Sequence, residues 1–585
     1  MDIYKYSLIA LCILVLNGCK PASPEEKAGG GNLALTTGYT LNQSDFNVLS
    51  ADEQFMVANK ALSTMYRGLP LDQFFDLTQG LESPSVQYDN FISSTQVSLQ
   101  TPLSQLERRN LDARILGLDD DVDTVENDSI QGRFNTFDND QPHQIYMARM
   151  QTYPLSKDQF VTWMSYFLAN TIMFSPAREM DSTNSQDIVR VLGYLDGSLN
   201  ADKPIRDVVR GWLHNLSRWR VSRSPENHAL EMFELYLGIF NDTPEEIQNT
   251  INGGKACGSW YLTDNNADYQ LLIDLTKPEG TKSYEVFGKF VTNCEDLYDV
   301  VAGHPRLIPR VIEVIVNYFM DGSSSSVKQN LIQSIVNSNP VTFNDVFLGV
   351  MFSKSFLLTS ERVKTFEENA LGFLNSMYWN PRANSGELGR GAIDSLLDSD
   401  RFDSGADIGV HRMGWAAMNY KIGRTPFLPM DVLSFATYHK AIRQEVLMNQ
   451  RAYDGRSFPK ETDFTEADEP RPAPFPIYAG AFYIEGTENL KPELDSLTAE
   501  EFIDFVFLTA MGRRATDVEV AAFIAEGDQT NRHYLTTDDD GVVQLRRSGG
   551  GVDELYEYWA DDFAEIMLDY ISRLPEFYYY RPATL

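Results

Sequence analysis

Residues 307–319 read LIPRVIEVIVNYF, and their apolar side chains recur at the three- and four-residue spacing of one α-helical face. The residues that form this face are Leu307, Ile308, Val311, Ile312, Ile315, Tyr318 and Phe319. The same spacing follows Ala51 and recurs around Phe366. Thr243 and Pro244 begin another helix, with a capping hydroxyl and a proline at the first helical position. These stretches predict a chain built from helices.

Strand signals are few, and the best short candidates are residues 478–483 and 542–545. Hydrophobic residues make up 43% and aromatic residues 12% of the chain, which is typical of a folded globular protein. We therefore predict a mainly α fold, with a multi-helical body, long ordered loops and a smaller C-terminal helical unit.

A Pro- and acid-rich stretch over residues 457–495 divides the chain, because proline interrupts helices and clustered carboxylates favour solvent. We expect a helical main domain over residues 41–456 before it. After it, residues 496–585 are expected to form the C-terminal helical unit.

The first residues resemble a bacterial lipoprotein signal. A basic Lys5 precedes an apolar run over residues 7–16, which is too short for a spanning helix. Leucine, asparagine and glycine then lead directly into Cys19. The resemblance implies that residues 1–18 are removed, that Cys19 is acylated, for example with palmitate, and that residues 19–40 form a flexible tether.

Lys20 follows the predicted acylated cysteine, where aspartate would signal retention in the inner membrane. The resemblance therefore implies an outer-membrane lipoprotein that meets the membrane through its lipid anchor and faces either the periplasm or the cell surface. The alternative is an ordinary secretory signal that is cleaved elsewhere.

The net charge of −34 excludes nucleic acid as an expected partner, because such a field repels phosphates. It favours cationic partners, divalent cations or simple solubility in salt. Neither a haem-attachment Cys-x-x-Cys-His motif nor a phosphate-binding Gly-x-x-x-x-Gly-Lys motif occurs, so neither haem nor a nucleotide is expected as a cofactor.

Of the four cysteines, Cys12 lies in the predicted signal and Cys19 carries the predicted lipid. Cys257 and Cys294 remain, and an even pair in an oxidising compartment predicts one disulfide. This bond would close a loop of about 37 residues and, through the lost entropy of the unfolded chain, would raise the free energy of unfolding by roughly 3–4 kcal/mol.

Residues 225–238 read PENHALEMFELYLG. This stretch resembles the signature helix of a large secreted bacterial family that is known only as domain of unknown function number eighteen hundred. The matching positions are Glu226, Asn227, Ala229, Glu231, Glu234, Leu235 and Gly238. His228 stands where the family has tyrosine, and Leu230 where it has arginine.

The resemblance extends over about residues 150–380, where His304-Pro305 and the helix to Phe319 look like a later block of the same family. It implies a helical secreted protein, often encoded beside a sulfatase-like partner, with no established reaction. This chain would be a divergent member.

Glu226, His228, Glu231 and Glu234 are the candidate catalytic residues, because the last three follow one another at three-residue spacing on a helix. Carboxylates beside an imidazole could bind a divalent cation or perform acid–base chemistry. The alternative is structural: Glu226 and Asn227 cap the helix, and the other side chains form buried hydrogen bonds between helices.

Asp119, Asp121 and Asp123 have the first ligand spacings of a calcium loop. The pattern then departs, since Thr124 replaces the turn glycine and Ile130 the final glutamate. The alternative to a metal site is a solvated acidic loop.

Two features near the C-terminus have structural readings beside functional ones. Thr516 and Glu519 have the spacing of a helix capping box. The aromatic run 577–581 is either a stacking or sugar-binding surface or a docked tail.

The absence of catalytic motifs favours a lipid-anchored envelope protein with a binding or assembly role, directed at a co-encoded sulfatase-like protein or a surface polymer. The alternative is a periplasmic hydrolase that uses the Glu/His cluster, with or without a metal.

Overall fold

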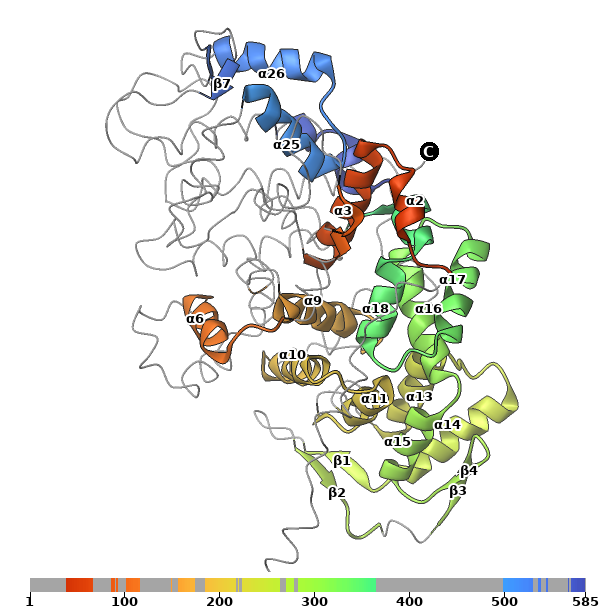
Figure 1. Ribbon diagram of the computed structural model, residues 1–585. Coiled ribbons are helices and arrows are strands. Elements are labelled where there is room, and N and C mark those ends of the chain that lie inside the picture. The colour runs from red at the N-terminus through yellow and green to blue at the C-terminus, as the bar shows by residue number, and fades with distance from the viewer. Residues whose placement is uncertain are drawn as a thin grey trace, which may run out of the picture.

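The computed structural model describes residues 38–66, 86–89, 91, 92, 101–115, 149, 156–173, 185–216, 219, 222, 224–263, 270–277, 282–364, 498–529, 535–537, 543–545, 567 and 570–583. Helices account for 65% of these residues and strands for few. The predicted mainly α fold is therefore confirmed (Figure 1).

The helices follow one another along the chain in the order shown in Figure 1. The α-helices are α2 (Gln43–Asn47), α3 (Ala51–Tyr66), α6 (Gln105–Ile115), α9 (Lys157–Asn170), α10 (Ser185–Asn200), α11 (Ile205–Leu213), α13 (Pro225–Met232), α14 (Pro244–Ala256), α15 (Cys294–Gly303), α16 (Leu307–Phe319), α17 (Ser325–Asn337), α18 (Phe343–Met351), α25 (Ala499–Met511) and α26 (Asp517–Gln529). The described residues also include two π-helical turns, η3 (Phe233–Leu237) and η4 (Ser355–Thr359), and one 3-10 turn, η8 (Pro575–Tyr578).

The strands of the described residues are short and pair only two by two, all antiparallel. The pairs are β1 (Trp260–Leu262) with β2 (Leu271–Ile273), β3 (Tyr284–Val286) with β4 (Lys289–Val291), β5 (Arg362–Val363) with β8 (Tyr579–Tyr580), and β6 (Leu535–Thr537) with β7 (Val543–Leu545). The β1–β2 and β3–β4 hairpins lie beside α14 and α15 at the end of the molecule opposite α25 and α26 (Figure 1).

The helix predicted from residues 307–319 is α16, and it packs against α11, α15, α17 and α18. Its predicted inner residues are buried, with Ile308 and Tyr318 at the edge of the core. Its C-terminal end enters an aromatic cluster with α9 and α18, in which the Phe167 ring lies 5.2 Å from both Phe319 and Phe347. Burial of such rings contributes a large apolar area at one point.

Helix beginnings follow the capping signals in the sequence. The Thr243 hydroxyl accepts a hydrogen bond from the Glu246 amide, and the Glu246 carboxylate accepts one from the Thr243 amide, so α14 begins with a capping box. Thr516 and Glu519 make the same reciprocal bonds ahead of α26, as predicted. Each box satisfies amide groups that a helix leaves without intrahelical acceptors.

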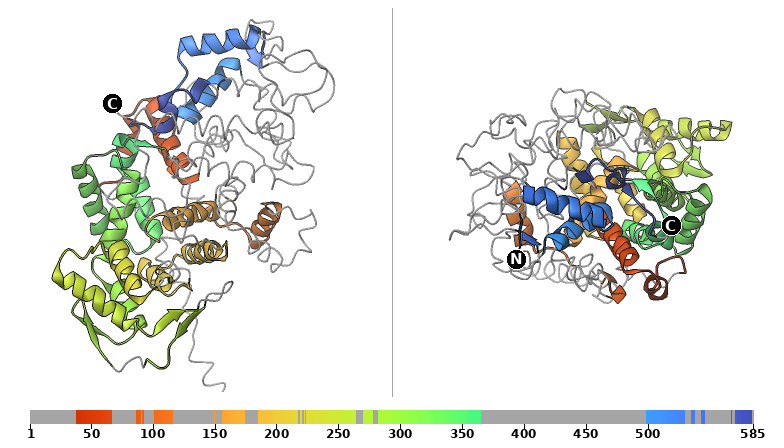
Figure 2. Two further views of the ribbon diagram at one scale, coloured as in Figure 1. Left: turned by 180° about the vertical axis from the view of Figure 1, so that it is seen from behind. Right: turned by 90° about the horizontal axis from the view of Figure 1, so that it is seen from above.

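The C-terminal segment packs on the N-terminal helix α3, and both views in Figure 2 place them side by side. Asn59 in α3 donates to the Leu508 carbonyl of α25 at 3.2 Å. Strand β8 pairs with β5, and Tyr578 and Tyr580 are buried. The aromatic run is thus a docked tail, the simpler of the two predictions.

Several predictions fall on residues that the structure does not describe: the signal over 1–18, Cys19, the linker over 457–495, the strand candidate at 478–483, and the helix around Phe366. The division into a main domain over 41–456 and a unit over 496–585 stays a prediction. Within the described ranges, no helix is long and apolar enough to cross a membrane.

Candidate functional site

Helix α13 carries the predicted Glu/His cluster, and its local sequence explains where it begins. Ser224 is the N-cap and accepts from the Asn227 amide at 3.2 Å, while Pro225 occupies the first helical turn. We expected Glu226 and Asn227 to cap this helix, but the residue that caps it is Ser224. Asn227 still helps to fix the turn, because its Nδ2 donates to the Ser222 carbonyl at 3.0 Å.

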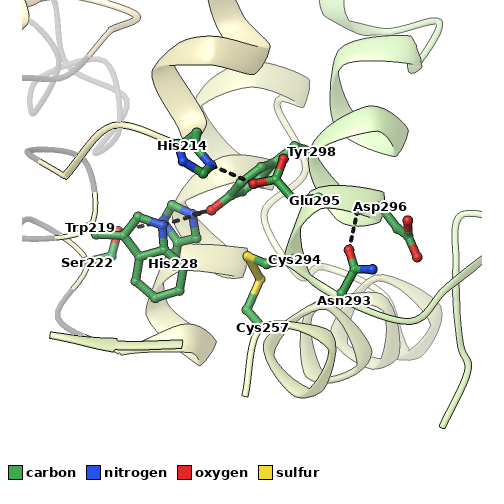
Figure 3. The surroundings of a disulfide bond; sticks show 10 residues. All are labelled: His214, Trp219, Ser222, His228, Cys257, Asn293, Cys294, Glu295, Asp296 and Tyr298. Atoms are coloured by element: carbon green, nitrogen blue, oxygen red, sulfur yellow. Dashed lines mark hydrogen bonds and ion pairs between the residues drawn. A yellow bond between two sulfur atoms is a disulfide. The ribbon is translucent and has the colours of Figure 1, made fainter. Parts of the chain in front are cut away.

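His228 is fully buried, and both ring nitrogens have partners (Figure 3). Nδ1 lies 3.2 Å from the Ser222 hydroxyl, and Nε2 lies 3.2 Å from the Tyr298 hydroxyl on α15. Tyr298 also accepts a hydrogen bond from Trp219 Nε1 at 2.8 Å. The Trp219 ring stacks on the imidazole with centroids 4.2 Å apart. The imidazole thus joins α13 to α15, as the structural alternative predicted.

The three glutamates differ in exposure rather than sharing one solvent-facing site. Glu231 is buried, Glu234 is partly exposed and Glu226 is exposed. The backbone of Glu226 lies against α14, because a Cβ added at Gly254 would come within 3.0 Å of the Glu226 Cα. Among the described residues, no group of three or more His, Cys, Asp or Glu side chains is placed to hold a metal ion.

The predicted disulfide between Cys257 and Cys294 is present, with both residues fully buried and their Cα atoms 4.4 Å apart. It joins the C-terminal end of α14 to the first residue of α15. On the nearby surface, His214 Nδ1 lies 2.6 Å from a carboxylate oxygen of Glu295, a contact drawn in Figure 3. We call α13, α14, α15 and the Cys257–Cys294 disulfide the disulfide region.

The calcium-like aspartates Asp119, Asp121 and Asp123 lie outside the described residues, so the metal prediction there stays a prediction.

A second site, which the sequence patterns do not reveal, is a cavity between α3, α25 and strand β8; we call it the junction cavity. Most of its empty volume is the opening to solvent, and the enclosed space has room for only a few water molecules. The described residues that line it are Met56, Asn59, Lys60, Ser63, Lys364, Thr509, Ala510, Met511, Gly512, Phe577, Tyr579, Tyr580 and Arg581.

Lys60 lies in the wall of this cavity with only 4% of its surface exposed. Its Nζ donates to the Ser360 carbonyl at 2.7 Å, to the Ser360 hydroxyl at 2.8 Å and to the Arg581 carbonyl at 3.4 Å. The Ser360 hydroxyl in turn donates to the Phe356 carbonyl at 2.6 Å, which leaves its lone pairs for the amine. The three donors of the ammonium are therefore matched by neutral oxygens.

Two further cations are buried close by. Arg362, on β5, has its guanidinium 4.9 Å from the Tyr580 ring centroid, and Lys364 Nζ lies 5.2 Å from the same centroid. Burial, followed by the charge of Arg362, holds the pKa of Lys60 well below its usual value, and Glu361 opposes this shift.

No protein-family model, curated protein or solved structure matches this chain. The resemblance of residues 225–238 to the secreted bacterial family stays a prediction. The function must therefore be argued from the residues themselves.

Proposed function

We propose that this protein is a lipid-anchored protein of the bacterial cell envelope with a binding or assembly role. The observation that carries the proposal is the buried disulfide between Cys257 and Cys294. Disulfides form and persist in oxidising compartments outside the cytosol and are rare within it. The bond therefore supports export of the chain.

The residues before Cys19 support anchoring by lipid. A short apolar run that ends in a small residue and a cysteine is the pattern of an acylated mature N-terminus. Two or more acyl chains hold a protein on a membrane far more firmly than one. Lys20 supports the outer membrane as the destination.

The surroundings of His228 favour binding over catalysis by α13. A general base must reach the proton that it removes. The imidazole is fully buried, and its two nitrogens lie against Ser222 and Tyr298. A hydrolase centred on this helix would need the ring to leave both partners. As a divergent member of the secreted family, the chain would bind a sulfatase-like neighbour or a surface polymer.

The test compares the full chain with Cys19→Ser in a Gram-negative host. We expect incorporation of labelled palmitate and co-fractionation with outer membranes for the native chain, and loss of both in the variant. Cys12→Ala is the matched control, because it changes a cysteine of the apolar run and leaves the acylation position intact.

Thiol trapping without reductant adds a second readout, in which Cys257 and Cys294 resist alkylation until the protein is reduced. A native chain that takes up no palmitate and fractionates with soluble proteins would overturn the lipid anchor. Free thiols at these two positions would remove the argument for export.

A further inference from the structure

We propose that the contact between α6, α9 and α10 is a pH-sensitive switch, in which Asp196 binds a proton in acid and the three helices then separate less readily. The proposal goes beyond the binding role inferred above and does not depend on the lipid anchor. An exported chain is exposed to the pH of the medium around the cell, and this contact would respond to it.

The first argument is the balance of charge at this contact. The charged groups that the described residues bring together there are Arg108 and Asp112 of α6, Asp158 of α9, Asp196 of α10, and Arg149. Arg149 binds the Asp112 carboxylate through two hydrogen bonds, each 2.9 Å long. Among the described residues, three carboxylates thus share two cations, which leaves one negative charge uncompensated when all three are ionised.

Asp196 has the smallest share of these cations. One nitrogen of Arg108 lies 2.7 Å from an oxygen of Asp158 and 3.1 Å from Oδ2 of Asp196. Two carboxylates held by one nitrogen place like charges close together, which favours a proton on one of them. Asp158 also accepts from the Leu103 amide at 2.6 Å, whereas Oδ1 of Asp196 is buried and no described group donates to it. Asp196 is therefore the carboxylate that gains most from a proton.

Burial acts in the same direction. The side chain of Asp196 is only 13% exposed, so its ionised form gives up most of the hydration that a carboxylate has in water. This burial is the largest influence and raises the pKa of Asp196. Arg108 and Arg149 oppose the rise in part, and Asp158 and Asp112 add to it.

Helix α6 meets the other two helices beside one end of each (Figure 1). Arg108 ties it to both, since its two carboxylate partners lie on α9 and α10. Lys157, the first residue of α9, does not relieve the imbalance, because it donates to the Asn200 carbonyl at 3.1 Å and pairs with Asp202 at 2.7 Å. The uncompensated charge thus stays where the three helices meet.

The direction of the switch follows from the raised pKa. Because the folded pKa of Asp196 lies above the unfolded value, the folded state binds the proton more tightly than any state in which water reaches this side chain. The stabilisation is fully present below the unfolded pKa and is lost as pH rises through the folded pKa. Local openings that hydrate Asp196 are therefore rarer in acid than at neutral pH.

The experiment measures amide hydrogen exchange in the full-length chain, purified in detergent, from about pH 7 to about pH 4. Native protein and Asp196→Asn are compared at each pH, because asparagine stands in for the protonated side chain. We expect α10 to be better protected in the variant at neutral pH. This advantage should shrink as pH falls, by up to about tenfold per pH unit, until the two proteins agree.

Two results would overturn the switch. One is a ratio of protection between variant and native protein that stays constant with pH. The other is better protection of the native protein at neutral pH, which would mean that the ionised carboxylate stabilises the contact. Asp202→Asn is the matched control, since this nearby aspartate is 39% exposed and has its own lysine partner. It should not raise protection at neutral pH.

Asp158→Asn supplies an independent test that does not alter Asp196. It removes the competing carboxylate and leaves Arg108 to Asp196, so the gain in protection of α10 in acid should become smaller than in the native protein. An unchanged gain in a folded Asp158→Asn protein would contradict the shared cation as its origin. None of these outcomes bears on the lipid anchor, which palmitate labelling tests.

Discussion

The disulfide region and the junction cavity treat buried polar groups in opposite ways. In the disulfide region, the Tyr298 hydroxyl is hydrogen-bonded to both His228 and Trp219, and these contacts need no net charge. At the junction cavity, Lys60 is a buried amine that meets neutral oxygens beside open space. The first network needs no charge, whereas the second supplies a neutral oxygen to each donor of a buried amine, so both have structural roles.

The largest effect is expected from removing the disulfide, which tests how much this covalent bond contributes to the stability of the disulfide region. Replacing Cys257 and Cys294 together by alanine should lower the free energy of unfolding by about 3–4 kcal/mol, because the unfolded chain regains the entropy of a long loop. Urea unfolding of the native and variant proteins, each with and without reductant, measures this. If the double variant matches the oxidised native protein, the bond contributes nothing to stability.

The next effect tests whether His228 is structural. His228→Ala should cost about 2–3 kcal/mol, because it removes the stack on Trp219 and leaves Tyr298 and Ser222 beside a void. His214→Ala is the control, since that ring is 53% exposed. Urea midpoints give the comparison. A variant of native stability that has lost a bound metal or ligand would instead favour the hydrolase alternative.

The smallest effect is expected at Glu519, a charged group whose contribution to stability should depend on pH, unlike that of the neutral network around His228. Glu519, in the first turn of α26, accepts from Arg513 at 2.9 Å and from the Thr516 amide at 2.7 Å. Burial alone would raise its pKa, but the hydrogen bonds from Arg513 and Thr516 outweigh burial and lower the pKa to about 2.

Because the folded pKa of Glu519 lies below the unfolded value, its stabilisation is present above about pH 4.5 and is lost as pH falls towards 2. Glu519→Gln should therefore cost about 1–2 kcal/mol at pH 7, discounted for partial exposure, and progressively less in acid. Asp517→Asn, an exposed neighbour, is the control. A difference between native and Glu519→Gln that does not change with pH would contradict this origin.

Local signals in the sequence predicted the local structure well. The apolar spacing over 307–319 corresponds to α16 (Leu307–Phe319). The capping hydroxyl of Thr243 and the proline that follows it mark the beginning of α14, as predicted. The strand expected at 542–545 is β7 (Val543–Leu545). The hairpins β1–β2 and β3–β4 were missed, because strands of three residues are too short to show alternation.

The sites were harder to predict because they depend on distant partners. The Cys257–Cys294 pairing needed only a count of cysteines and an inferred compartment. His228 sits in a motif, but its burial against Tyr298 comes from the packing of α15. Lys60 belongs to an ordinary helical pattern, and its role depends on Ser360 and Arg581, which lie 300 and 521 residues away.

Those separations have a consequence for the order of folding. Contacts that close very long stretches of chain carry a high entropic cost before they contribute stability, and they tend to form late. The helices around α16 have near neighbours in sequence and can assemble first. The hydrogen bonds from Lys60 to Ser360 and Arg581 would then be among the last to form, so their presence would report that α3, η4 and the C-terminal segment have reached their native arrangement.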